Sequence, residues 1–375
     1  MTKSPVLLAF GGLLAMAAGI GIGRFVYTPI LPPMVAALGL TKSQAGLIAS
    51  ANFVGYLAGA LLAALRLPGT RRTWLLAALA VNVACLAAMG LTDSLSLFLL
   101  LRLVAGLASA FILIFASALV LDRLAVAGRS GLSALHFAGV GTGIALSAAL
   151  VSTSSDWRAM WFASAALALL ASLAVVALVP ADPARAAGST EPHRPARLST
   201  RFLVLAAAYG LFGFGYIITA TFIVAMVRGT AEIAGLEPYI WVMFGLSAAP
   251  SVALWTRLGV RWGILATFAV AAIVEAIGVA ASALWITAAT VVLSSIFVGG
   301  TFMGLTALGL IAAREGEGDP RGRIALMTAS FSAGQILGPT FAGYIYDLTG
   351  SLAGPSWCAV AALVVAAGLC VAIKR

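Results

Sequence analysis

Long apolar runs alternate with short polar breaks along the whole chain. Each run has about the length of a membrane-spanning helix, which needs about 20 apolar residues. The first six predicted spans are residues 6–34, 43–65, 73–91, 95–121, 130–152 and 157–179. The second six are residues 202–227, 237–256, 262–282, 285–312, 324–346 and 354–373. The pattern therefore predicts an all-α, polytopic membrane protein with 12 transmembrane helices.

A polar segment divides this pattern in the middle. Residues 180–200 read PADPARAAGSTEPHRPARLST, a mixture of Pro, Ala and basic residues that is typical of a solvated linker. We therefore expect an N-terminal six-helix bundle over residues 1–179, a cytoplasmic linker over 180–200 and a C-terminal six-helix bundle over 201–375.

The two predicted bundles carry similar residues at similar places. Residues 21–24 of the first span align with residues 213–216 of the seventh, at an offset of 192. The fourth and fifth spans align with the tenth and eleventh at offsets of 194 and 195, through Gly106 with Gly300 and Gly139 with Gly334. Parallel repeats of this kind predict two pseudo-symmetric bundles, as in one class of transporter.

Composition and charge agree with a membrane protein. Apolar residues make up 62% of the chain and charged residues 9%, against about 45–50% and about 25% in soluble domains. Of the 22 Lys and Arg residues, 17 fall at one set of helix ends and only Lys42, Arg158 and Arg228 at the other. This bias predicts an inner-membrane protein with both termini in the cytoplasm. It also explains the net charge of +10 without nucleic acid as a partner.

The sequence lacks the usual signatures of enzymes and metalloproteins. It contains no phosphate-binding loop, no H-E-x-x-H and no G-x-S-x-G. Cys85, Cys358 and Cys370 lie within apolar runs, which disfavours a disulfide framework or a zinc site. We therefore expect no enzyme activity, no metal and no cofactor, and we interpret the N-terminal apolar stretch as an uncleaved first span.

Three polar residues reach a similar depth in the predicted membrane. Arg24, Asn52 and Arg102 each lie nine residues from the same side of the bundle. At about 1.5 Å of rise per residue, they lie about 13 Å deep, near the middle of a hydrocarbon core about 30 Å thick. Two guanidinium groups without a nearby carboxylate favour an anionic ligand. Alternatively, each arginine bonds to neighbouring helix carbonyl groups and braces the bundle.

Three tyrosines complete the candidate substrate site. Tyr27 lies one helical turn from Arg24, and Tyr56 one turn from Asn52, so both hydroxyl groups can face the same cavity. Tyr216 occupies the position that the repeat makes equivalent to Arg24. The alternative is that these rings fill helix interfaces.

Glu275 and His136 are the candidates for proton coupling. Glu275 is the only acid deep in a predicted span, where a carboxyl group can carry a proton. His136 enters the fifth span near its cytoplasmic end and can titrate near neutral pH. A structural, hydrogen-bonded role is the alternative for each.

Several motifs resemble those of the major facilitator superfamily, over nearly the whole chain. GIGRFVYTPILPP at 21–33 and HFAGVGTG at 136–143 resemble its YbfB/YjiJ-like branch, and residues 334–339 with Ala342 and Gly343 resemble a pattern of its eleventh span. Arg102 with Gly106 is similar to its R-x-x-x-G motif. The resemblance implies the major facilitator fold, with a central cavity lined mainly by spans 1, 4, 7 and 10 and transport by rocking alternating access.

Two departures from the superfamily pattern limit this resemblance. The loop of residues 66–72 lacks the acidic residue of the usual gating signature, which puts that gating ion pair in doubt. The fifth span lacks the Gly-Pro pair typical of antiporters, which disfavours drug efflux.

Together these observations predict a secondary active transporter for a small organic anion. We expect a coupling proton, a lipid bilayer and a small-molecule substrate as partners, and a monomer. The alternative is an efflux pump for drugs or other amphipathic compounds, in which the arginines only brace the cavity. A membrane scaffold or sensor without flux is a third hypothesis.

Overall fold

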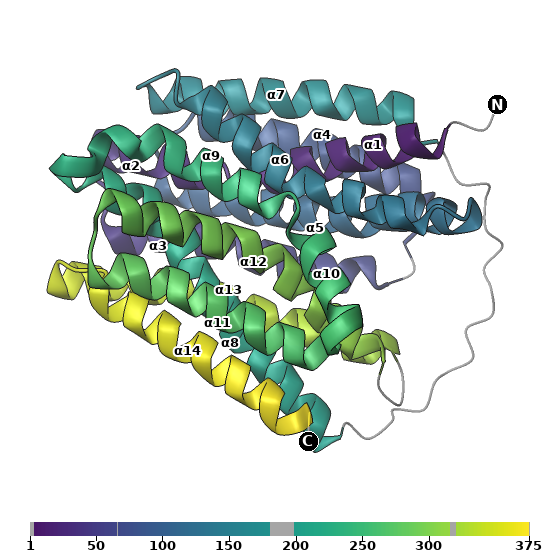
Figure 1. Ribbon diagram of the computed structural model, residues 1–375. Coiled ribbons are helices and arrows are strands. Elements are labelled where there is room, and N and C mark those ends of the chain that lie inside the picture. The colour runs from purple at the N-terminus through teal and green to yellow at the C-terminus, as the bar shows by residue number, and fades with distance from the viewer. Residues whose placement is uncertain (1–3, 66, 181–198, 316–319, 375) are drawn as a thin grey trace.

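The computed structural model describes residues 4–65, 67–180, 199–315 and 320–374, and its helices run back and forth along one long bundle (Figure 1). The helices of the first half are α1 (Pro5–Met16), α2 (Tyr27–Leu38), α3 (Lys42–Ala63), α4 (Arg71–Met89), α5 (Leu95–Val126), α6 (Ser133–Val151) and α7 (Trp157–Leu178). Those of the second half are α8 (Thr200–Arg228), α9 (Glu237–Ala248), α10 (Ser251–Trp262), α11 (Ile264–Leu284), α12 (Ala288–Arg314), α13 (Pro320–Thr349) and α14 (Ala353–Lys374). Most of the predicted linker, residues 181–198, lies outside the described residues.

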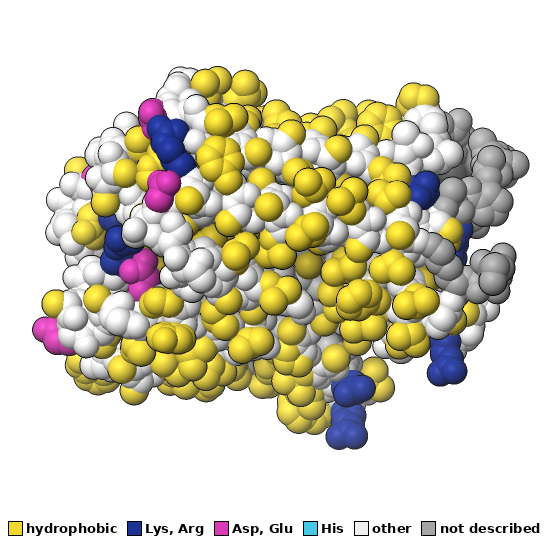
Figure 2. Space-filling model, turned by 90° about the horizontal axis from the view of Figure 1, so that it is seen from above, with side chains coloured by type: hydrophobic (Ala, Val, Ile, Leu, Met, Phe, Trp, Pro, Cys, Tyr) yellow, Lys and Arg dark blue, Asp and Glu magenta, His cyan; other side chains and the backbone are white. Residues whose placement is uncertain are grey.

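The two ends of the bundle differ in charge. We call the end where α1 and α8 begin the terminal end, and the opposite end, where α3 and α12 begin, the distal end. On the face seen in Figure 2, acidic side chains gather at the distal end, while Lys and Arg occur at both ends of an apolar middle band. The chain is therefore a multi-pass membrane protein, with lipid around this band.

The described helices account for most of the predicted passes. Ten of the described helical segments, with Pro5–Leu38 counted as one, are long and apolar enough to cross a membrane, and the bent pair α9 and α10 forms an eleventh. The remaining helix, α13, carries polar residues, of which Ser332 and Gln335 are fully buried. If α13 is counted as a further pass, the described helices match the 12 predicted passes.

Two predicted spans are broken rather than continuous. In the first span, α1 runs into a π-helical segment, η1 (Ala17–Ile22), and a turn over residues 23–26 precedes α2. Glycines at 19, 21 and 23 favour this break because glycine weakens a helix. In the eighth span, α9 and α10 are bent by 40° beside Pro250. The predicted end at residue 256 was too early, because α10 continues to Trp262 and Gly263 forms the following turn with φ of 85°.

The repeat predicted from glycine positions also appears in the packing. A methyl group on Gly139 of α6 would meet the carbonyl oxygen of Leu13 in α1. A methyl group on Gly334 of α13 would likewise meet the carbonyl oxygen of Gly210 in α8. In each half, therefore, small residues of the fifth pass let its backbone approach the first pass closely, as expected where no hydrophobic effect drives helix association.

The two halves contact each other mainly through α3 with α13 and α6 with α9. Ser50 of α3 donates a hydrogen bond to the carbonyl oxygen of Ile336 in α13, at 2.7 Å. Nearer the distal end, Asp347 accepts hydrogen bonds from the backbone N–H groups of Lys42 (3.0 Å) and Ser43 (2.9 Å). Since α3 starts at Lys42, the second half caps a helix of the first. The two halves are therefore joined along α3 and α13 at the distal end.

Candidate functional site

The break in the first pass leaves several carbonyl groups without their usual helical partners. The N–H of Gly23 bonds to Ala18 rather than to Gly19, and Pro29 has no N–H to offer to Phe25. Side chains from other helices replace these partners. Ser109 of α5 donates to the carbonyl oxygen of Gly19 at 2.8 Å. The packed bundle thus stabilises a segment that departs from the α-helix, and an unpaired carbonyl group within a membrane would be costly.

Trp241 of α9 supplies the partner for Phe25 from the other half. Its Nε1 donates a hydrogen bond to the Phe25 carbonyl oxygen at 3.2 Å, and its side chain is fully buried. This bond joins the second half of the chain to the residue next to Arg24. The break in the first pass is therefore also part of the contact between the two halves.

Arg102 braces this break through main-chain oxygens. Its Nη1 donates to the carbonyl oxygen of Gly23 at 3.1 Å, and its Nη2 to that of Arg24 at 3.0 Å. The predicted site residue Asn52 donates in turn to the carbonyl oxygen of Arg102 at 3.0 Å. Tyr27 lies beside the Arg102 guanidinium, 5.1 Å from ring centroid to Cζ, and its hydroxyl donates to Ala45. These hydrogen bonds agree with the alternative that Arg102 bonds to helix carbonyl groups and braces the bundle.

Arg24 has a different environment. Its guanidinium carbon lies 4.4 Å from the ring centre of Tyr56 and 4.5 Å from that of Phe53, in cation–π geometry. Its Nη2 donates a hydrogen bond to Oε1 of Gln335 at 2.8 Å, while its Nε has no hydrogen-bond partner. The side chain is only 6% exposed. Within the described part of the chain, no carboxylate forms an ion pair with it.

Gln335 connects Arg24 to the tyrosine that the repeat makes equivalent to it. The side-chain Nε2 of Gln335 donates a hydrogen bond to the hydroxyl of Tyr216. Since Gln335 lies in α13 and Tyr216 in α8, Arg24 is joined to two helices of the other half. Sequence reasoning missed Gln335, because it used only the small residues on either side. The available signal was a polar amide within an apolar run.

Aromatic rings of the second half form a layer beside Arg24. Tyr216 stacks on Phe302, with ring centres 5.5 Å apart, and on Phe331, at 5.9 Å. Phe25, the residue after Arg24, packs against Phe302 at 5.7 Å. Four helices contribute to this layer through Phe212 and Tyr216 (α8), Trp241 and Phe244 (α9), Phe302 (α12) and Phe331 (α13). Arg24 thus lies beside a packed layer of buried aromatic rings.

The two proton-coupling candidates lie on two further helices, α11 and α6. Glu275 in α11 is fully buried and accepts a hydrogen bond from Thr301 at 2.7 Å, but its Oε1 has no partner. His136 in α6 is also fully buried, with Nε2 3.0 Å from the hydroxyl of Ser117 and Nδ1 without a partner. Neither residue forms a hydrogen bond with Arg24 or Gln335 among the described atoms. The described residues also contain no cluster of three potential metal ligands.

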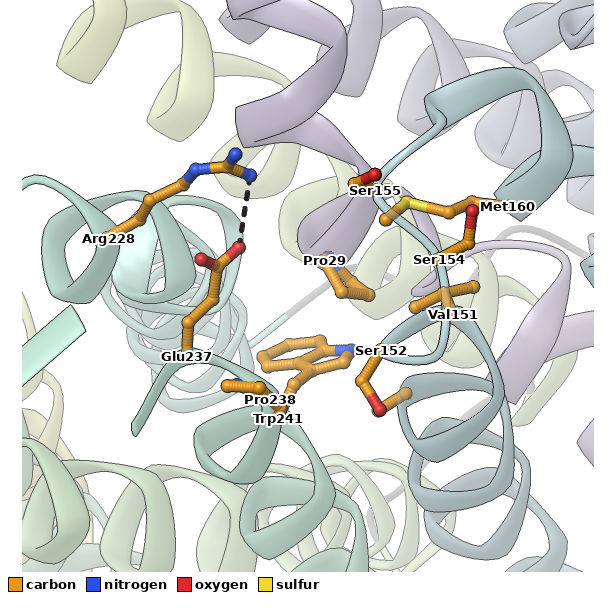
Figure 3. Close-up of a pocket in the computed structure, with 11 residues that line it drawn as sticks. Pro29, Val151, Ser152, Ser154, Ser155, Met160, Arg228, Glu237, Pro238 and Trp241 are labelled. Carbon is orange, nitrogen blue, oxygen red and sulfur yellow. Dashed lines mark hydrogen bonds and ion pairs between the residues drawn. The ribbon is translucent and has the colours of Figure 1, made fainter. Parts of the chain in front are cut away.

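A crevice opens at the distal end, between the two halves (Figure 3). It holds about 200 Å³, and the ion pair between Arg228 and Glu237 (3.3 Å) lies on one side of it. Ser152 and Val151 line the other side, and the Trp241 ring lies between the two sides. Trp241 therefore both lines the crevice and donates a hydrogen bond to the backbone of the broken segment, at Phe25.

Two repeated helical bundles that meet along a polar seam are the architecture of many secondary transporters. Comparison with known proteins gives the family. The family model described as "Uncharacterised MFS-type transporter YbfB" matches residues 16–371. The chain therefore belongs to the YbfB family of major facilitator superfamily transporters. Members of this family are transporters, so the predictions of the fold and of a protein that is not an enzyme are confirmed.

Comparisons with individual proteins agree with this fold. A chloramphenicol resistance protein from Streptomyces lividans is 30% identical over 377 residues, which cover 96% of this chain and 94% of that relative. The crystal structure of the nucleoside transporter NupG matches with a TM-score of 0.72 at 15% identity, over 99% of each chain. A bacterial homologue of the human lysosomal transporter Spinster, inward-facing and unoccupied, matches with a TM-score of 0.71 at 16% identity, over 100% of this chain and 98% of that one.

Proposed function

We propose that this transporter moves a small organic anion and that Arg24 binds the anionic group. One observation carries the proposal: Arg24 is buried in mid-membrane with a neutral amide as its hydrogen-bond acceptor. A buried charge without a counter-charge is strongly unfavourable. A carboxylate would compensate the charge and could accept two parallel hydrogen bonds from the guanidinium.

The remaining residues near Arg24 define the rest of the substrate. Tyr56 and Tyr216 lie against Arg24 and Gln335, and the aromatic layer continues from Tyr216 to Phe302. This surface suits a flat apolar group attached to the carboxylate, as in benzoate or phenylacetate. In this proposal Arg102, Asn52 and Tyr27 act indirectly, because they hold the backbone that carries Arg24.

The charge bias along the chain favours one orientation of the bundle in the membrane. We assign the terminal end to the cytoplasm, because it carries most of the Lys and Arg residues. The distal end, where α3 and α13 are joined, would then face outward.

A coupling proton would make the uptake of an anion favourable. An anion entering a cell works against an inside-negative potential, at about 2.3 kcal/mol per charge and 100 mV. A proton carried with it cancels that charge. We assign this proton to Glu275 rather than His136, because Glu275 lies opposite Thr301, the neighbour of Phe302 in the aromatic layer.

Export of an amphipathic compound is the second candidate. It is favoured by the relative from Streptomyces lividans, whose name refers to chloramphenicol resistance. The aromatic layer alone would serve such a substrate, and Arg24 would then only join the two halves.

Counterflow in proteoliposomes distinguishes these proposals. We expect labelled benzoate or phenylacetate to exchange, with benzyl alcohol and chloramphenicol as neutral comparisons. The variant Arg24→Ala should lose this exchange, whereas Arg228→Ala, which removes an exposed cation, should keep it. Full transport with unchanged affinity in Arg24→Ala would contradict the anion site. Exchange of chloramphenicol alone would favour export, and no exchange of any probe would favour a scaffold or sensor.

A further inference from the structure

Gln335 holds the position that an anionic substrate would occupy next to Arg24. Its Oε1 lies 2.8 Å from Nη2 of Arg24, within the range for an N–H donor of arginine and a carboxylate oxygen. The Gln335 side chain is fully buried, so it shields this nitrogen from water. Its own Nε2 bonds to Tyr216, whose ring is fixed between Phe302 and Phe331. The amide oxygen is therefore held in place as an acceptor for Arg24.

This hydrogen bond depends on the position of the two halves. Arg24 belongs to the first half and Gln335 to α13 of the second. One turn further towards the distal end, Ser50 of α3 bonds to Ile336 and Thr340 of α13. When α3 and α13 separate to open the distal side, Arg24 must lose Gln335 along with these contacts. Arg24 then faces the open cavity, where water or an anion can solvate it.

The distal side can close again only if Arg24 regains an acceptor. A loaded transporter carries the substrate carboxylate for this purpose. An unloaded transporter would bury the bare guanidinium, which would prevent closure, unless a group of the protein takes the place of the substrate. Among the described contacts of the Arg24 side chain, the Gln335 amide is the hydrogen-bond acceptor from the other half.

We propose that Gln335 is an internal substitute for the substrate, which lets the unloaded transporter close its distal side and return empty. This inference rests on the proposed role of Arg24 as the anion site. In this inference, net transport rather than strict one-for-one exchange depends on Gln335, a single residue that contacts both halves. Without Gln335, the transporter would cross between its two states only when loaded.

The first experiment measures closure without any substrate. Spin labels at Leu91 and Trp285, exposed positions on distal loops of the two halves, report the distance across the distal end in protein without its three native cysteines. We expect short distances in the unloaded parent protein and a loss of most of this population in Gln335→Leu. Ser50→Ala, which removes a neutral hydrogen bond from the same seam, should keep it. Combining Gln335→Leu with Arg24→Leu should restore the short distances, because no buried charge then needs a partner.

The second experiment compares net efflux with counterflow of benzoate from proteoliposomes. Gln335→Leu should lower net efflux by about tenfold or more, while counterflow stays within about twofold of the parent protein. Unchanged label distances in Gln335→Leu, failure of Arg24→Leu to restore them, or equal loss of efflux and counterflow would overturn the inference. A parent protein that moves neither benzoate nor phenylacetate contradicts the proposed substrate instead. The label distances then still decide whether Gln335 holds the unloaded protein closed.

Discussion

Arg102 holds the backbone of Arg24, since its Nη2 donates a hydrogen bond to the Arg24 carbonyl oxygen at 3.0 Å. Two arginines of similar depth thus have different tasks. The two terminal nitrogens of the Arg102 guanidinium donate hydrogen bonds to two carbonyl groups that the broken helix leaves unpaired. Arg24 directs its own guanidinium to the seam between the halves. The brace therefore fixes the position from which Arg24 meets Gln335 or a substrate.

Replacing Arg102 should destabilise the protein more than replacing a surface arginine. Arg102→Met leaves the carbonyl oxygens of Gly23 and Arg24 without partners, at about 1–3 kcal/mol for each buried group. We expect a clear drop in the thermal unfolding temperature in detergent. Arg228→Met, which breaks a partly exposed ion pair with Glu237, should cost about 1 kcal/mol or less. Equal unfolding temperatures of the two variants would contradict the brace.

A carboxylate at position 335 should act as a permanent substrate substitute. Gln335→Glu places an anionic oxygen next to Arg24, so the two side chains would form a buried, hydrogen-bonded ion pair. We expect thermal stability at or above that of the parent protein, with benzoate counterflow reduced by about a hundredfold or more. The amide variant Gln335→Asn is the control for the change in shape. Benzoate affinity that is unchanged in Gln335→Glu would argue against Arg24 as the anion site.

Asp347 should stabilise the closed distal end. Its carboxylate accepts the N–H groups of Lys42 and Ser43 and so caps α3, and loss of a helix cap costs about 0.5–2 kcal/mol. Asp347→Ala should shift the spin-label distances at Leu91 and Trp285 towards the open form. Asp122→Ala, which removes an exposed carboxylate at the terminal end, is the matched control and should leave them unchanged.

A single methyl group should block closure at the same seam. In Gly46→Ala, the new Cβ would overlap the carbonyl oxygen of Pro339 in α13. Backbone cannot yield easily in a packed interface, so α3 and α13 would have to separate. Labels on the distal loops should report a more open protein. In Gly235→Ala, where the added methyl group meets nothing within 4 Å, the distances should match those of the parent.

Glu275 should be required for benzoate uptake driven by a pH gradient, but not for counterflow of benzoate. Glu275→Gln keeps a carbonyl oxygen that can accept from Thr301, but it cannot release a proton. Benzoate uptake driven by an imposed pH gradient should fall by about tenfold or more, while counterflow at equal pH continues. Thr301→Val provides the comparison in which the carboxyl group stays but loses its hydrogen bond. Equal loss of uptake and counterflow in Glu275→Gln would indicate a structural role.

Several features could be predicted from the sequence because they depend on local pattern. The lengths of the apolar runs predicted the membrane passes, and the glycine offsets predicted a repeat. Gly139 and Gly334 occupy equivalent positions in this repeat, and each lies close to the backbone of the first pass of its half. The depth of Arg24 in the membrane stays a prediction, which rests on helical rise. The division at residues 180–200 stays a prediction, since most of that segment lies outside the described residues.

The tertiary structure decided what each polar group contacts. Sequence could not tell Arg24 from Arg102, because depth fixes a height in the membrane and not a direction around the helix bundle. It did not indicate Gln335 either, since that amide gains its meaning only when α13 packs against α3. The length and composition of a helix are set by neighbouring residues along the chain, whereas the partner of a buried charge is set by residues hundreds of positions away.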